Sequence, residues 1–180
     1  MKQKIGNGKK IVLAAHCLLN PNAKVWGLSN DGGASERIAA YLQEGTGIIQ
    51  LPCVEMDMCG VMRWGHVKNQ FDYPMFRRRC RELLEPIVNQ VEDYLEHGFE
   101  CAGIIGVDGS PTCGVNVTAQ GHWYGDFVEG NNYEEKINSA FFERGKGIMM
   151  EELSAMLAQR NITIPFESVS EENIFRGDRT

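Results

Sequence analysis

Residues 9–17, KKIVLAAHC, give the clearest indication of the fold class. Its residues 11–15 form a short, continuous apolar run, and such a run is typical of a strand that is covered on both faces. Further strand candidates are residues 47–51, 102–107 and 162–164. Pro165 stops the last of them, because proline cannot donate a ladder hydrogen bond.

Between these runs the apolar residues recur at helical spacing. The pattern predicts helices at about residues 36–43, 72–97 and 147–160. Pro86 lies inside the second of them and is expected to kink or divide it. Strands that alternate with helices indicate a parallel sheet. We therefore expect an α/β fold, a three-layer sandwich with a small parallel sheet of about four strands.

Residues 115–146 differ from the rest of the chain. They contain several glycines and the aromatic run HWY at residues 122–124, and we expect a long irregular segment after the third core strand. Long irregular segments are usually functional or mobile, so this one is a candidate lid that stacks on a flat substrate. The alternative is that its aromatic residues are ordinary core. Residues 1–180 are expected to form a single α/β domain.

Composition narrows the class of protein. The net charge of -6 argues against a nucleic-acid partner. No run approaches the length that spans a bilayer, and the apolar run at residues 11–15 is too short for a signal peptide. We therefore expect a cytoplasmic protein without a membrane partner. In that reducing compartment the six cysteines are not expected to form disulfides.

Three of the cysteines follow predicted strands. Cys17, Cys53 and Cys113 come after the first, second and third strand candidates. Ligands bind beyond the carboxyl ends of parallel strands, so these three are expected to meet at one edge of the sheet. Cys101 begins its strand, and Cys80 repeats with the apolar face of a helix. Both are expected to be core residues.

Three convergent thiols suit a soft metal. Zinc in a structural site takes four ligands, and Cys59 or His16 could supply the fourth. An iron–sulfur cluster is normally held by four cysteines, so three would leave one iron open to a substrate. A single nucleophilic cysteine without metal is the main competing interpretation.

Polar residues beside these cysteines are candidates for chemistry. Glu55 lies two residues after Cys53, where a carboxylate could move protons, or it is a solvated loop charge. Ser110 precedes Cys113 in a tight turn, where it could orient a substrate or cap the turn. Asp31 lies in a turn-forming run, residues 30–33 (NDGG), which alone is most often only a turn.

In these motifs the chain resembles the thiouracil desulfidase (TudS) family. That family looks like CLLG, YDGG, CPE and SPSCG in this order. This chain has CLLN at 17–20, NDGG at 30–33, CVE at 53–55 and SPTCG at 110–114. Order and spacing agree over roughly residues 10–115. The chain departs from the family at Asn20, Val54 and Thr112, which replace glycine, proline and serine.

The resemblance implies a [4Fe–4S] cluster held by Cys17, Cys53 and Cys113. It further implies a small-molecule thiolated heterocycle as substrate, whose thiocarbonyl sulfur binds the fourth iron and is replaced by water without net redox change. Glu55 and Ser110 are then the candidates for handling protons and orienting the substrate, and Asp31 is a weaker one. The departures suggest that the chain belongs to a divergent branch of that family. If Cys59 were a fourth ligand of the cluster, no iron would be open to a substrate, which would argue against catalysis.

Overall fold

The computed structural model describes residues 9–28, 33–126 and 128–170. Within this part of the chain, a parallel sheet has the strand order β2-β1-β3-β6. Its strands are β1 (Lys10–Ala14), β2 (Gly47–Gln50), β3 (Glu100–Val107) and β6 (Phe166–Val169). The α/β class and the parallel four-stranded sheet predicted from the sequence are confirmed.

The two central strands, β1 and β3, are apolar on both faces. Val12, Leu13 and Ala14 of β1 are fully buried, and so are Ile104 and Ile105 of β3. Strands that are covered by helices on both sides have no need of polar side chains on either face. This is why the continuous apolar runs in the sequence identified these two strands.

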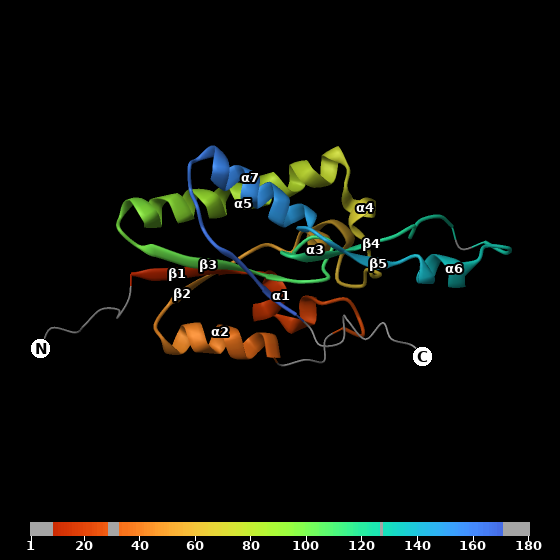
Figure 1. The fold of residues 1–180 in the computed structure, drawn as a ribbon, viewed down its shortest axis with the longest axis horizontal. Helices are drawn as coiled ribbons and strands as arrows, with labels where there is room; N and C mark the ends of the chain where they lie inside the picture. Colours follow the sequence, from red (N-terminus) through yellow and green to blue (C-terminus); the bar gives the residue numbers. More distant parts are fainter. Residues whose placement is uncertain (1–8, 29–32, 127, 171–180) are drawn as a thin grey trace, which may run out of the picture.

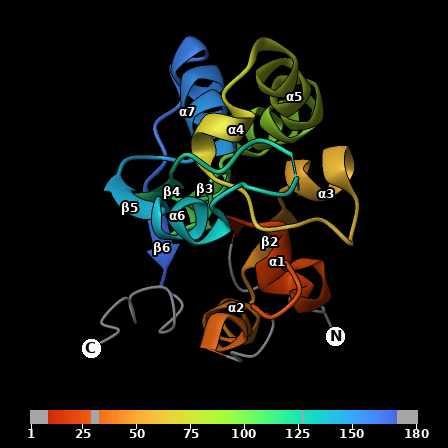
Figure 2. The same ribbon diagram turned by 90° about the vertical axis from the view of Figure 1, so that its right-hand side faces the viewer.

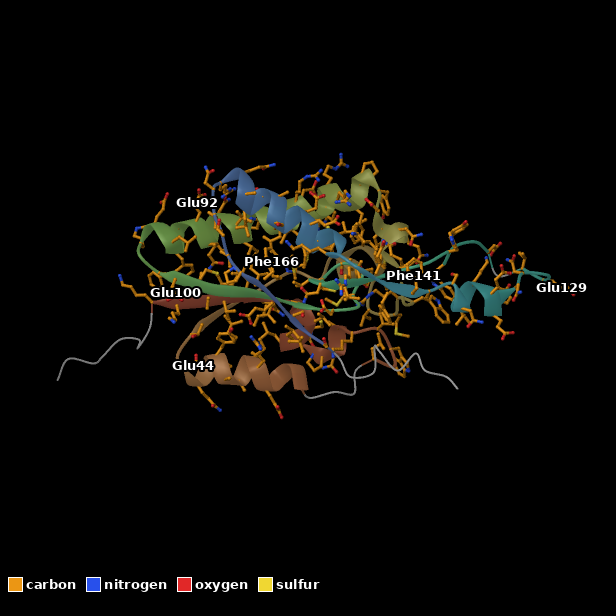
Figure 3. The ribbon with its side chains drawn as sticks, in the orientation of Figure 1. Glu44, Glu92, Glu100, Glu129, Phe141 and Phe166 are labelled. Carbon is orange, nitrogen blue, oxygen red and sulfur yellow. The ribbon has the colours of Figure 1, made fainter. Side chains whose placement is uncertain are left out.

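Helices cover both faces of the sheet and complete three layers (Figure 1). On one face lie α5 (Pro74–Glu96) and α7 (Ile148–Gln159), and on the other lie α1 (His16–Leu19), the short 3-10 helix η1 (Pro21–Ala23) and α2 (Gly33–Gln43). Side chains fill the space between the layers (Figure 3). The three-layer sandwich expected from the sequence is present.

The fourth strand lies further along the chain than predicted. Residues 162–164 are not a strand, and β6 begins at Phe166, after Pro165. The carbonyl of Pro165 accepts a hydrogen bond from the Ile104 N–H at 2.9 Å, so pairing with β3 begins at this proline. Ile164 is buried as a packing residue. The proline thus precedes the strand, a position in which its missing N–H does no harm.

Helix α5 runs through Pro86 as one helix and is not divided. The proline lies on the exposed side of the helix, and so does Glu82, whose carbonyl loses its intrahelical partner. Water can satisfy a carbonyl on that side. The opposite side buries Phe76, Leu84 and Val91, and this packing holds the helix on the sheet.

Residues 115–146 are more regular than predicted. They contain β4 (Val117–Gln120), α6 (Tyr133–Asn138) and β5 (Phe141–Arg144). β4 and β5 pair antiparallel, with Val117 opposite Arg144. These strands are not evident in the sequence, because each has only four residues and lacks a continuous apolar run.

The carboxyl ends of β1, β2 and β3 face the viewer in Figure 2. Around them lie α1, the β4–β5 ribbon and two short helices, α3 (Val54–Cys59) and α4 (Lys68–Phe71). In the described residues, no helix combines the length and the apolar character needed to cross a membrane.

Candidate functional site

The three strand-end cysteines line one cavity. Cys17 lies in α1 after β1, Cys53 immediately precedes α3 after β2, and Cys113 lies in the loop after β3. The cavity has a volume of about 410 Å³. Cys80 is buried in α5, and Cys101 is buried at the amino-terminal end of β3. The structure therefore brings together the same three cysteines that the sequence analysis grouped.

Polar groups also line this cavity. Glu55 and Ser110, both singled out from the sequence, are among them. The other polar side chains in its wall are Lys24, Arg63, His66, Asp108 and Thr112. Acidic, basic and hydroxyl groups are thus available beside the thiols.

The loop after β3 is held by its own side chains. The Ser110 hydroxyl accepts hydrogen bonds from the N–H groups of Cys113, at 3.0 Å, and Thr112, at 3.3 Å. The Asp108 carboxylate accepts hydrogen bonds from the N–H groups of Val115, Asn116 and Val117. Ser110 therefore caps the turn, as one of its two predicted roles required, and it also faces the cavity.

Close backbone packing positions Cys113. A Cβ atom on Gly106 of β3 would lie 2.3 Å from the carbonyl oxygen of Cys113. A Cβ atom on Gly114 would lie 2.3 Å from the carbonyl oxygen of Val117. Contacts this short are forbidden, so only glycine permits the loop to fold back onto the end of its strand.

Cys53 lies at the start of helix α3. Burial raises the pKa of the Cys53 thiol, and the nearby Glu55 carboxylate adds to this effect. Hydrogen bonds from the N–H groups of Met56 and Glu55 and the positive charge of Arg63 act in the opposite direction. The backbone N–H groups at the helix start therefore favour a thiolate at this position, against the effect of burial.

Cys113 is the most deeply placed of the three thiols. Burial raises its pKa well above the usual value, and negative charge on Cys17 and Cys53 raises the pKa further. The hydroxyl of Thr112, 3.6 Å from the sulfur, acts in the opposite direction. Three neighbouring thiols cannot all ionise here without a compensating positive charge.

Glu55 is not a solvated loop charge, because only 6% of its surface is exposed. Its Oε1 accepts a hydrogen bond from the Thr112 hydroxyl at 2.6 Å. Its Oε2 lies 3.4 Å from Nε of Arg63, which makes a buried ion pair. Both carboxyl oxygens thus have a donor on the protein, which fixes the group in the cavity wall.

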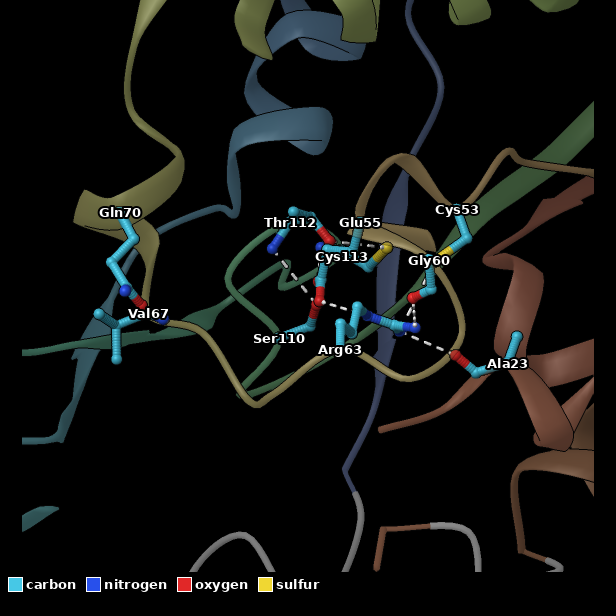
Figure 4. Close-up of polar contacts among 10 residues, drawn as sticks. All are labelled: Ala23, Cys53, Glu55, Gly60, Arg63, Val67, Gln70, Ser110, Thr112 and Cys113. Carbon is cyan, nitrogen blue, oxygen red and sulfur yellow. Dashed lines mark hydrogen bonds and ion pairs between the residues drawn. The ribbon is translucent and has the colours of Figure 1, made fainter. Parts of the chain in front are cut away.

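Arg63 is a site residue that the sequence analysis missed. It lies between α3 and α4, and its side chain is only 4% exposed. Besides Glu55, its guanidinium donates to the carbonyl oxygen of Ala23 at 2.8 Å and lies 4.0 Å from the Cys53 sulfur (Figure 4). The only signal in the sequence is a single basic residue in the apolar, glycine-containing run at residues 60–65 (GVMRWG).

These contacts connect all three segments that carry the cysteines. Ala23 belongs to the segment that follows Cys17, Arg63 and Glu55 follow Cys53, and Thr112 precedes Cys113. Arg63 donates hydrogen bonds to the Ala23 carbonyl and to the Glu55 carboxylate, and the Thr112 hydroxyl donates to the same carboxylate (Figure 4). We call this set of hydrogen bonds the Ala23–Arg63–Glu55–Thr112 network. It fixes the cysteine-bearing segments relative to one another.

Two other predicted candidates lie elsewhere. Cys59 is the last residue of α3, is exposed, and is not among the residues that line the cavity. Asp31 lies outside the described residues. The structure thus assembles Cys17, Cys53 and Cys113 without Cys59.

The aromatic run of the predicted lid faces a different space. Trp123 and Tyr124 line a second cavity of about 180 Å³, together with Trp64 and Tyr133. From residues 115–146, the cysteine cavity takes Ala119 and Phe142 instead. The role of this segment as a lid stays a prediction.

The side chains of residues 9–28, 33–126 and 128–170 do not form a preformed binding site for a single metal ion. No three histidine, cysteine or acidic side chains in these ranges are arranged to hold one metal ion. The three thiols line a common cavity and interact electrostatically.

Comparison with known proteins identifies a relative. No family model matches the chain, and no solved structure matches it. Over 109 residues it is 37% identical to the uncharacterized protein MJ0003 of Methanocaldococcus jannaschii, an alignment that covers 60% of this chain and 69% of the relative. The chain therefore belongs to the same family as MJ0003.

Proposed function

We propose that this protein is a non-redox desulfidase that removes sulfur from a thiocarbonyl compound, with a [4Fe–4S] cluster held by Cys17, Cys53 and Cys113. The observation that carries the proposal is the meeting of three strand-end cysteines and the buried carboxyl of Glu55 in one cavity. The motifs shared with the thiouracil desulfidase family support the same activity.

The donor set fits such a cluster. Thiolates are the usual ligands of iron–sulfur clusters. Zinc in a structural site takes four ligands, whereas a cluster with one open iron takes three, the number of cysteines that line the cavity. A bound cluster would also supply the iron charge that three neighbouring thiolates need.

The overall reaction is a hydrolysis in which a thiocarbonyl compound and water give a carbonyl compound and hydrogen sulfide. When bound, a cluster with three protein ligands supplies an iron with an open position, a Lewis acid for the thiocarbonyl sulfur. Glu55 accepts a proton from the attacking water, since each carboxylate oxygen has a second lone pair beyond its bond to Thr112 or Arg63. The Ser110 hydroxyl, fixed by its turn, orients the substrate.

Two further features support this assignment. A cavity of about 410 Å³ suits a small heterocycle. A metal-free cysteine nucleophile, the competing interpretation, needs a thiolate near neutral pH, and at Cys113 burial opposes this by raising the pKa of the thiol. A further alternative is a protein that uses a cluster or zinc for binding or sensing. It differs from an enzyme in turning over no substrate.

Turnover by protein purified without oxygen tests the proposal. Iron-loaded protein mixed with 2-thiouracil or 4-thiouracil should release sulfide and uracil in equal amounts. Glu55→Gln should keep its iron and lose about 100-fold or more in kcat, because the amide keeps the size of the side chain but cannot accept the proton. Glu44→Gln is the matched control, since Glu44 is exposed and lies shortly before the amino-terminal end of β2, whereas the cavity lies at the carboxyl ends of the strands.

Two results would contradict the proposal. One is the absence of sulfide release from fully iron-loaded protein with every thiolated heterocycle tried, which would leave the binding or sensing alternative. The other is equal turnover by wild type and Glu55→Gln, which would remove the carboxylate from the mechanism.

A further inference from the structure

One buried polar atom has no partner. Throughout the described residues, Nδ1 of His66 is the only buried side-chain nitrogen or oxygen without a hydrogen bond. Such an atom is rare in a folded protein, because burial removes its water without replacing the lost hydrogen bond. The ligand-free protein is thus destabilised at His66 by the lost hydration of this nitrogen. A ligand that donates a hydrogen bond to the nitrogen would explain why such an atom is present.

His66 lies at a junction. The residue lines both the cysteine cavity and the second, aromatic cavity, so the two cavities have it in common. The imidazole packs on Phe71 with a ring-centre distance of 4.6 Å and an interplanar angle of 35°. Phe71 is itself buried and stacked on Phe76, so the histidine is backed by the domain core.

We propose that His66 is a substrate-recognition residue whose Nδ1 accepts a hydrogen bond from an N–H group of the bound heterocycle. This inference rests on the proposed function, and it narrows the substrate class to planar thioamide-type rings that carry a ring N–H. Recognition requires the imidazole to turn about χ2, a torsion that is broad in histidine, so that Nδ1 reaches the ligand. Binding then satisfies the nitrogen that the free protein leaves unpaired.

Two substitutions separate recognition from packing. His66→Phe keeps a ring against Phe71 and removes both nitrogens, whereas His66→Asn keeps a polar atom near the position of Nδ1 and loses the ring. If His66 recognises the ligand, His66→Asn should keep most of the ligand affinity and lose thermal stability. His66→Phe should lose ligand affinity and keep its thermal stability. A purely structural role makes affinity and stability change together.

The binding probe is uracil, which has the ring N–H groups of the product and no sulfur. Calorimetric titration of iron-loaded protein should show uracil binding that is weakened about tenfold in His66→Phe and by less than about threefold in His66→Asn, as expected for one lost hydrogen bond. The Tm of His66→Phe should equal or exceed that of wild type. Uracil methylated on both ring nitrogens should bind both variants and wild type equally weakly.

The outcomes for His66 and for the reaction are separable. His66-dependent uracil binding without sulfide release supports the recognition role and removes the desulfidase. Sulfide release with the same KM and kcat in His66→Phe and wild type overturns the recognition role and leaves the desulfidase. Absence of uracil binding, or a lowered Tm of His66→Phe with unchanged affinity, also overturns it.

Discussion

Thr112, Glu55 and Arg63 form a buried polar contact next to the cysteines. Thr112 is 1% exposed and Glu55 is 6% exposed, and the two are joined by a hydrogen bond of 2.6 Å. A hydrogen bond to a charged acceptor in such surroundings is stronger than one between neutral groups. Thr112 also lies beside Cys113, so its hydroxyl connects the carboxyl to a cysteine segment.

This geometry predicts different effects for two substitutions at residue 112. Thr112→Val keeps the shape of the side chain and removes the donor, which should lower the free energy of unfolding by about 1–3 kcal/mol and reduce turnover. Thr112→Ser keeps the hydroxyl and should retain most of the turnover. The departure from the serine of the thiouracil desulfidase motif is thus conservative in its chemistry.

Chemical denaturation and steady-state kinetics on both variants check this prediction. Wild-type protein is the reference for each measurement. If Thr112→Val equals Thr112→Ser in stability and in kcat, the hydroxyl contributes nothing to the position of Glu55.

At the scale of elements, strand β3 and its loop place Cys113. Two glycines in this strand have different surroundings, although both belong to the same element. A Cβ atom on Gly103 would lie 3.5 Å from the carbonyl oxygen of Pro165, an ordinary contact, whereas one on Gly106 would lie 2.3 Å from the carbonyl oxygen of Cys113. The strand therefore tolerates a side chain at one position and excludes it at the other.

Gly106→Ala should displace the loop and lower the free energy of unfolding by about 1–3 kcal/mol, the usual cost of overpacking. It should also reduce the iron content, because Cys113 moves with its carbonyl group. Gly103→Ala is the matched control and should change neither property appreciably. Iron analysis and thermal melts of the two variants are sufficient. Equal iron content in both would show that the tight approach does not position the ligand.

At the scale of the whole molecule, three strands of the parallel sheet could be predicted from the sequence, because they are continuous apolar runs. The runs at residues 11–15, 47–51 and 102–107 correspond to strands β1, β2 and β3 of the structure. Because the carboxyl ends of parallel strands lie at one edge of the sheet, the three cysteines that follow these runs could be placed together, and they line one cavity. Burial at the centre of a sheet requires such runs, so the pattern is strong there.

Contacts between distant segments are not visible in the sequence. Arg63 reaches Ala23 across 40 residues, and nothing in the local pattern of either segment indicates this hydrogen bond. The β4–β5 ribbon is likewise specified by pairing between short segments rather than by a run of its own. Glu55 is also enclosed by contacts with residues of other segments, Thr112 and Arg63. The sequence therefore left open whether Glu55 was a solvated charge.

The iron and sulfide content of cysteine variants purified without oxygen shows whether Cys17, Cys53 and Cys113 hold a [4Fe–4S] cluster. Wild type should contain about four iron and four sulfide per chain, as the [4Fe–4S] formula requires, with the broad visible absorption of iron–thiolate sites. Cys17→Ser, Cys53→Ser and Cys113→Ser should each lose the cluster, while Cys59→Ser, Cys80→Ser and Cys101→Ser keep it. A full iron and sulfide content in Cys113→Ser, or a colourless wild type that contains zinc instead, would show that these three cysteines do not hold such a cluster.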